Sequence, residues 1–183
     1  MDWICGTGRC GTLSLARQVG GEHEPSPGIG PNCDVKAVLR TRLARGVPSS
    51  DRLHSLVIPQ IYEIDPEAKI LWLLRDPFSC VRSMLQTGHL DVEDSPYFPL
   101  PSDTLTEPAQ RAAWVWCHIN SQIWDSVQGR NYELIPTENL HRHEGASRKI
   151  VDLSEYRHLQ VEKVAGDLWR ALWNAFPILQ KAA

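Results

Sequence analysis

Residues 1–19 read MDWICGTGRCGTLSLARQV, and this stretch decides the fold. Its short apolar run Asp2–Cys5 predicts a β-strand, and residues 12–19, which end at a Gly-Gly pair, predict a helix. Between them lies the loop GTGRCG, residues 6–11. Glycines let backbone N–H groups converge on a ligand, and a helix N-terminus carries roughly half a positive charge. The stretch therefore indicates an anion-binding turn of an α/β protein, to which Arg9 adds a full cation.

Strands and helices alternate along the rest of the chain. The apolar run Lys69–Leu74 predicts a strand covered on both faces, and Asp76-Pro77 after it is a typical helix start. The alternation predicts a single α/β domain over residues 1–183, with a P-loop-like parallel β-sheet flanked by helices. The other predicted elements are a strand at Tyr132–Pro136, helices at Val35–Arg45, 53–64, Pro77–Thr87, 108–128 and 161–176, and loops at 20–34 and 88–105.

Composition narrows the class of protein. The 183 residues are 42% hydrophobic and carry a net charge of −3, which is ordinary for a soluble globular domain. No Lys/Arg block marks a nucleic-acid partner, and no signal peptide or membrane-spanning apolar stretch is visible, so no membrane partner is expected. The five cysteines form no CxxC pair, which favours reduced thiols in a cytoplasmic protein over a zinc site or disulfides. The oligomeric state cannot be read from the sequence.

The glycine loop fits three classes of nucleotide site. Residues 6–11 match the dinucleotide pattern G-x-G-x-x-G, but that site needs a strand ending in an acidic residue about 20 residues later, where residues 20–34 predict a loop. They also begin a Walker A motif, yet Thr12-Leu13 replaces the required Lys-Ser/Thr, which weakens a kinase-like interpretation. The third class places its cation inside the loop, as Arg9 is placed. A degenerate nucleotide or small-molecule kinase and a non-catalytic nucleotide-binding module remain alternatives.

Two motifs carry a resemblance to one family of the third class. Arg9-Cys10-Gly11-Thr12 resembles the 5′-phosphosulfate loop of sulfotransferases that use 3′-phosphoadenosine 5′-phosphosulfate (PAPS). Arg75-Asp76-Pro77 at the end of a strand, with Ser83 eight residues after Arg75, resembles the 3′-phosphate motif of the same family. A guanidinium binds phosphate through two donors and a hydroxyl adds a third, which suits Arg75 and Ser83.

The resemblance implies a short sulfotransferase that moves the sulfuryl group of PAPS to an unidentified hydroxyl or amine of a small molecule, glycan or peptide. The product is 3′-phosphoadenosine 5′-phosphate (PAP), and the chemistry needs no metal. Leu13 replaces the second threonine of the family loop, and Thr137 stands where an aromatic residue often stacks on adenine. The implied cofactor-binding residues are Arg9, Cys10, Gly11, Thr12, Leu13, Ser14, Arg75 and Ser83.

The implied catalytic residues lie in the loop and just after the first helix. Arg9 is the expected cation for charge that develops on the leaving oxygen. The sequence Glu22-His23-Glu24-Pro25 resembles a His-Glu-Pro stretch of several sulfotransferase branches. Some branches use a glutamate base and others a histidine, so we favour Glu24 and keep His23 as the second candidate. Pro25 is expected to hold the backbone at Glu24 extended.

Overall fold

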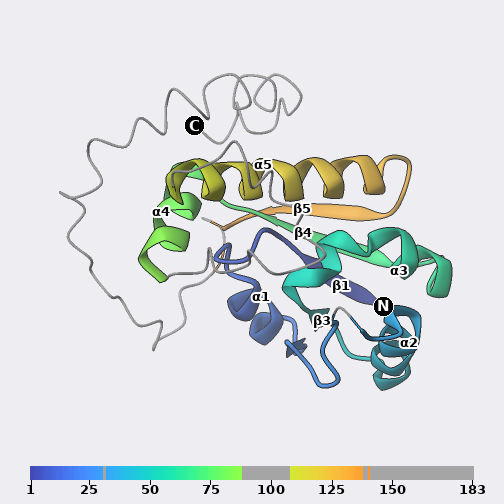
Figure 1. Ribbon diagram of the computed structural model, residues 1–183. Helices are drawn as coiled ribbons and strands as arrows, with labels where there is room; N and C mark the ends of the chain where they lie inside the picture. The colour runs from blue at the N-terminus through green and yellow to red at the C-terminus, as the bar shows by residue number, and fades with distance from the viewer. Residues whose placement is uncertain (31, 88–107, 138–139, 141–183) are drawn as a thin grey trace.

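The computed structural model describes residues 1–30, 32–87, 108–137 and 140. A parallel sheet forms its centre, in the order β2-β3-β1-β4-β5 (Figure 1). The predicted α/β class with a parallel sheet is therefore confirmed. The strands are β1 (Asp2–Cys5), β2 (Glu22–His23), β3 (Ser49–Ser50), β4 (Lys69–Leu74) and β5 (Tyr132–Pro136).

The helices follow the predicted positions closely. Asp34 caps α2 by accepting from the Ala37 N–H at 3.0 Å, and Asp76 accepts from the Ser79 N–H at 2.7 Å where α4 begins. The predicted helix at 53–64 is split by Val57 into a short 3-10 helix and α3. The helical elements are α1 (Thr12–Gln18), α2 (Val35–Arg45), η1 (Arg52–Leu56), α3 (Ile58–Ile64), α4 (Pro77–Thr87) and α5 (Pro108–Val127).

Both faces of the sheet are covered, because successive residues of β1 and β4 point to opposite sides and both sets are buried. The larger apolar cluster joins Trp3 and Trp72 to side chains of α2, α3, α4 and α5. The smaller cluster joins Ile4 and Leu71 to Leu15 of α1. Figure 1 shows this arrangement, with α5 above β4 and β5 and with α1 below the sheet. The predicted apolar stripe of α5 is buried at Ala112, Trp116, Ile119, Ile123 and Val127.

One prediction was wrong: residues 20–34 contain a strand. β2 is only two residues long and polar, so no apolar run marks it, and its Glu22 N–H donates to the Pro48 carbonyl beside β3 at 2.8 Å. The strand does not restore the dinucleotide interpretation, because β3 separates β2 from β1, whereas that fold places its first two strands side by side.

The predicted helix at 161–176 and the predicted loop at 88–105 lie outside the described residues. Within the described residues, none of the helices combines the length and the apolar character that crossing a bilayer requires.

Candidate functional site

The candidate site lies along the carboxyl edge of the sheet. All five strands are parallel, so the segments that follow them emerge at one edge, where open α/β sheets bind ligands. Glu24 follows β2, residues 6–11 (the phosphate loop) follow β1, Arg75 follows β4 and Thr137 follows β5. The sheet therefore brings together residues that lie far apart in the sequence.

The phosphate loop has the backbone of an anion-binding turn. Gly8, Arg9 and Gly11 have φ values of 70°, 53° and 96°, so three of its residues adopt the left-handed conformation. Such turns direct successive N–H groups to one side. The base of the loop is held by Ser55 of η1, whose Oγ accepts from the Gly6 N–H at 2.8 Å and donates to the Gly6 carbonyl at 2.9 Å.

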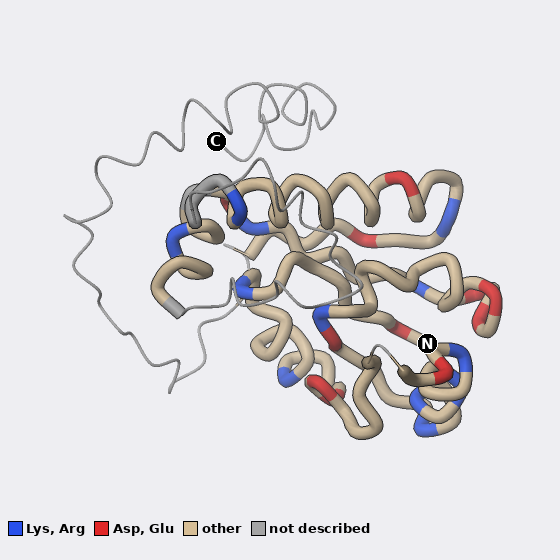
Figure 2. The backbone as a smooth tube through the Cα atoms, in the orientation of Figure 1, with Lys and Arg blue, Asp and Glu red and all other residues tan. Residues whose placement is uncertain are grey.

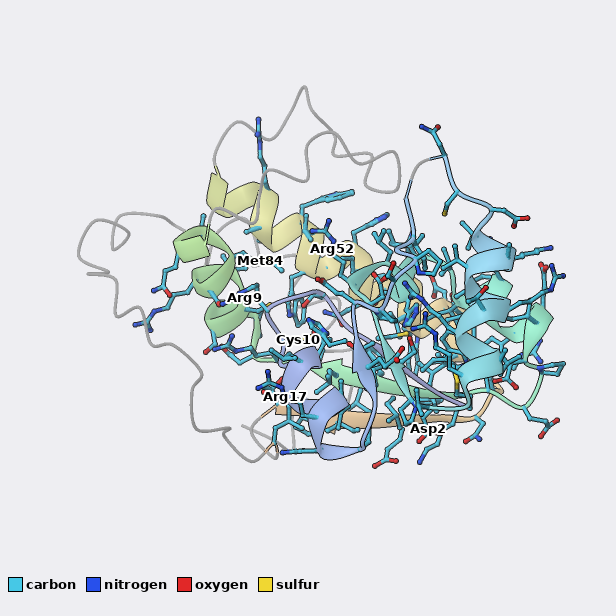
Figure 3. The ribbon with its side chains drawn as sticks, turned by 90° about the horizontal axis from the view of Figure 1, so that it is seen from below. Asp2, Arg9, Cys10, Arg17, Arg52 and Met84 are labelled. Carbon is cyan, nitrogen blue, oxygen red and sulfur yellow. The ribbon has the colours of Figure 1, made fainter. Side chains whose placement is uncertain are left out.

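The two predicted motifs contact each other. Nη1 of Arg75 donates to the carbonyl oxygen of Arg9 at 2.7 Å, and Nε of Arg9 donates to Oγ of Ser83 at 3.2 Å. Trp116 of α5 fixes the backbone of Arg75, because its indole Nε1–H donates to the Arg75 carbonyl at 3.1 Å. In Figure 3 Arg9 lies beside α4, which carries the labelled Met84. Figure 2 shows several Lys and Arg positions close to one another near α4 and the segment that follows β1.

Cys10 packs inside the loop. Its side chain is fully buried, and burial raises the pKa of its thiol to about 12. Cys80 of α4 lies close by, with its Sγ 3.3 Å from Oγ1 of Thr7, and burial raises its pKa to about 11. Both thiols are therefore protonated at neutral pH, which makes them packing residues rather than nucleophiles.

The three residues after Gly11 differ in exposure. Thr12 is buried at the start of α1, Ser14 is half-buried, and the Leu13 side chain is 42% exposed. The Leu13 side chain therefore faces solvent, and the group that this residue could offer an anion is its backbone N–H in the first turn of α1.

Thr137, which stands where the family that the motifs resemble often has an aromatic residue, contacts two backbone carbonyls. Its Oγ1 lies 2.7 Å from the Cys10 carbonyl and 3.2 Å from the Leu74 carbonyl. It thereby ties the phosphate loop to the end of β4. Thr137, Ser55 and Trp116 thus support the backbone of the phosphate loop and of Arg75. The sequence did not predict this role, since only the sheet topology brings these residues to the loop.

The two candidate bases lie at the same edge, two strands from the phosphate loop. His23 is on β2, and its Nδ1 is 3.2 Å from Oγ of Ser50. Glu24 is exposed, and its N–H donates to the Ser50 carbonyl at 2.6 Å. The expectation of an extended backbone at Glu24 was wrong: its φ is +47°, in the left-handed region that residues other than glycine rarely adopt. Such a conformation persists only where the surroundings impose it.

The described residues contain no group of three or more His, Cys, Asp or Glu side chains that is suited to hold a metal ion. His141 and His143, a closely spaced histidine pair in the sequence that has no third ligand cluster beside it, lie outside the described residues.

Gly6→Ala is expected to destabilise the protein through the phosphate loop. A Cβ at Gly6 would clash with Sγ of Cys10 and lie 3.1 Å from the Leu73 carbonyl oxygen, so the loop must shift. Overpacking of this kind costs about 1–3 kcal/mol, and Tm falls by about 2–4 °C per kcal/mol in a chain of this size. Thermal unfolding measures the effect, with Gly28→Ala as the control because nothing lies within 4 Å of a Cβ at Gly28. Equal melting of the two variants would contradict the packing around Gly6.

No protein-family model and no curated protein matches this sequence, but solved sulfotransferases match the structure. A sulfotransferase domain from the curacin biosynthetic pathway superposes with a TM-score of 0.51 and 13% identity, over 75% of this chain and 67% of that chain. A sulfotransferase from Alicyclobacillus acidocaldarius has a TM-score of 0.45 and 19% identity, over 75% and 72%. A third, from Mycobacterium avium, has a TM-score of 0.40 and 12% identity, over 79% and 34%. The curacin-pathway match shows that this chain has a sulfotransferase-like fold.

Proposed function

We propose that the protein is a PAPS-dependent sulfotransferase that transfers the sulfuryl group to a hydroxyl or amine acceptor and releases PAP. The observation that carries the proposal is the direct contact between the two motifs. Arg75 holds the Arg9 carbonyl at 2.7 Å, and Arg9 reaches Ser83 at 3.2 Å, although these residues are 66 and 74 positions apart in the sequence. A ligand with phosphates at both its 5′ and 3′ positions suits two cationic groups joined in this way.

The order of the strands supports a division of the site. Arg75 and Ser83 follow β4, on one side of the phosphate loop, and Glu24 follows β2, on the other side. Neighbouring strands lie about 4.8 Å apart, so β2 is roughly 10 Å from β1. In the proposed reaction the 3′-phosphate lies toward β4, and the acceptor enters from the side of β2. The acceptor oxygen or nitrogen attacks sulfur, the bond from sulfur to the bridging oxygen breaks, and Glu24 takes the acceptor proton.

The kinase alternative is disfavoured by the residue at the start of α1. A Walker A loop needs a lysine there to reach the β- and γ-phosphates, and this chain has Thr12, whose side chain is buried. The cations of this site are instead in the loop itself and at the end of β4. A non-catalytic nucleotide-binding module would keep the same contacts, and it differs from the proposal in having no transfer activity.

Nucleotide preference tests the proposal. PAP is expected to raise the Tm more than AMP does, because only PAP carries a 3′-phosphate for Arg75 and Ser83; a ligand at 100 times its Kd adds about 2.7 kcal/mol. Arg75→Ala is expected to weaken PAP binding by about 10²-fold, in line with the loss of a charge-assisted contact, and AMP binding far less. Arg82→Ala, an exposed arginine on the same helix as Ser83, is the matched control. Equal shifts from PAP and AMP in the unchanged protein would refute the 3′-phosphate site.

A further inference from the structure

A buried arginine lies beneath the segment that carries Glu24. Arg42 of α2 is 1% exposed, and its Nη2 donates to Oδ2 of Asp51 at 2.8 Å and to the carbonyl oxygens of Pro25 at 3.1 Å and Pro27 at 3.0 Å. Its Nη1 lies 2.6 Å from Nε2 of His54. A buried charge is tolerated only when it is paired and hydrogen-bonded; both terminal nitrogens of Arg42 have partners, and its Nε is buried without one.

The protonation states of this network follow from its geometry. Arginine has only donors, so Nε2 of His54 must accept, and the ring proton is on Nδ1, which faces the Ile4 carbonyl at 3.4 Å. The pKa of His54 is lowered to about 4, mainly by burial and with a smaller contribution from the adjacent Arg42, while the Asp51 carboxylate acts in the opposite direction. His54 is therefore a neutral acceptor, and Asp51, 5% exposed, is the counter-charge of Arg42.

Residues 24–28, which we call the Glu24 loop, are held through the carbonyl oxygens of two prolines. Proline has no N–H, so its carbonyl is its only backbone hydrogen-bonding group. Arg42 binds this group at Pro25 and Pro27, and β3 binds the Glu24 N–H through the Ser50 carbonyl at 2.6 Å. The left-handed backbone of Glu24 is thus fixed from both sides.

The same network reaches the phosphate loop. Asp51 accepts from the Leu53 N–H at 2.9 Å and so starts η1, which carries His54 and Ser55. Ser55 makes both hydrogen bonds to Gly6 at the base of the phosphate loop. One continuous set of buried contacts therefore connects the Glu24 loop, through Arg42 and η1, to the phosphate loop.

We propose that Arg42 is a positioning residue that holds the Glu24 loop in register with the phosphate loop. The proposal rests on the proposed sulfotransferase function, in which Glu24 must meet an acceptor placed against the cofactor. It makes no use of an Arg42 contact to substrate. A displacement of about 1 Å at a reacting group can lower turnover by about 10²-fold, so loss of these contacts affects turnover far more than cofactor binding.

The variant must not leave a buried charge without its partner. Arg42→Met combined with Asp51→Asn removes both charges and keeps the oxygen that accepts from the Leu53 N–H, and replacing a buried ion pair by apolar groups is often tolerated. Arg42→Lys is the second variant: it keeps the charge opposite Asp51, but an ammonium lacks the planar fork that serves four acceptors here. Arg40→Met, an exposed arginine on the same helix, is the matched control.

Amide hydrogen exchange of the PAP-bound protein gives a readout that needs no transfer. In both Arg42 variants we expect the Glu24 amide to exchange at least 10-fold faster than in the unchanged protein, while the Gly6 amide keeps its protection and the Kd for PAP stays within threefold. The Arg40→Met protein is expected to match the unchanged one. Unchanged protection of Glu24 in either folded variant would overturn the positioning role.

Turnover separates positioning from a general loss of structure. With PAPS and a panel of simple alcohols, phenols and amines as acceptors, we expect kcat of the double variant to fall by about 10²-fold at unchanged PAP affinity. A parallel loss of PAP binding would indicate a merely structural role and overturn the proposal. If the unchanged protein binds no PAP, the proposed function fails instead, and the exchange at Glu24 still tests whether Arg42 holds the loop.

Discussion

Glu24→Gln is expected to lower sulfuryl transfer by about 10³-fold while PAP binding stays unchanged. Glutamine has nearly the same size as glutamate and lacks the proton acceptor, and a positioned general base contributes about 10²–10⁴-fold. The substitution leaves in place the hydrogen bond from the Glu24 N–H to the Ser50 carbonyl, so we expect the loop to keep its backbone conformation. Steady-state rates with PAPS and an acceptor, together with the Kd for PAP, measure the two effects separately.

Two neighbouring residues provide controls for this result. Glu22→Gln removes an acidic group two residues before Glu24, whose Oε2 pairs with Arg45 at 2.6 Å on the surface, and an exposed pair of this kind contributes little. His23→Ala removes the second candidate base and its contact with Ser50, and it is expected to lower the rate much less than Glu24→Gln does. An active Glu24→Gln enzyme together with an inactive His23→Ala enzyme would reassign the base to histidine.

Much of the fold was readable from local sequence, because its elements carry strong local signals. β4 is an uninterrupted apolar run, α5 has an apolar residue at nearly every helical turn, and Asp76 caps α4 where its position predicted. β2 and β3 escaped notice for the opposite reason. Each is two residues long and polar, and each exists because a neighbouring strand offers a partner, β1 for β3 and β3 for β2, which is a property of the assembled sheet.

Residues of the candidate site could be predicted where they form short sequence motifs, but not where their role depends on contacts between segments far apart in the sequence. Arg9, Arg75 and Ser83 were predicted from their local patterns, and the structure brings them into contact. The supports of the site were not predicted. Ser55 and Arg42 lie on helical segments that contain no recognisable motif. Nothing in the sequence distinguishes Arg42, which is 1% exposed, from an arginine on the surface. Its role follows only from the carbonyls that the fold places around it.

The contact between Arg9 and Ser83 sharpens the remaining prediction, because it places the Arg9 guanidinium beside a residue assigned to the 3′-phosphate. Two roles are possible for that guanidinium: it stabilises charge on the leaving oxygen, or it helps Ser83 to bind the 3′-phosphate. Only the first role is specific to the transition state. Removing the Arg9 side chain leaves the contact with Arg75 in place, since Arg75 binds the main-chain carbonyl of Arg9 at 2.7 Å.

Arg9→Ala is therefore expected to lower kcat by about 10²–10³-fold, the loss seen when one preorganised donor to a developing charge is removed, and to weaken PAP binding by about 10-fold or less. Ser83→Ala is the comparison: it removes the partner of Arg9 and leaves the guanidinium, so PAP affinity falls and kcat stays close to that of the unchanged protein. Arg17→Ala, an exposed arginine on α1, controls for the loss of one positive charge. If Arg9→Ala and Ser83→Ala share one profile, with weaker PAP binding and full turnover, Arg9 binds the 3′-phosphate and another group stabilises the leaving oxygen.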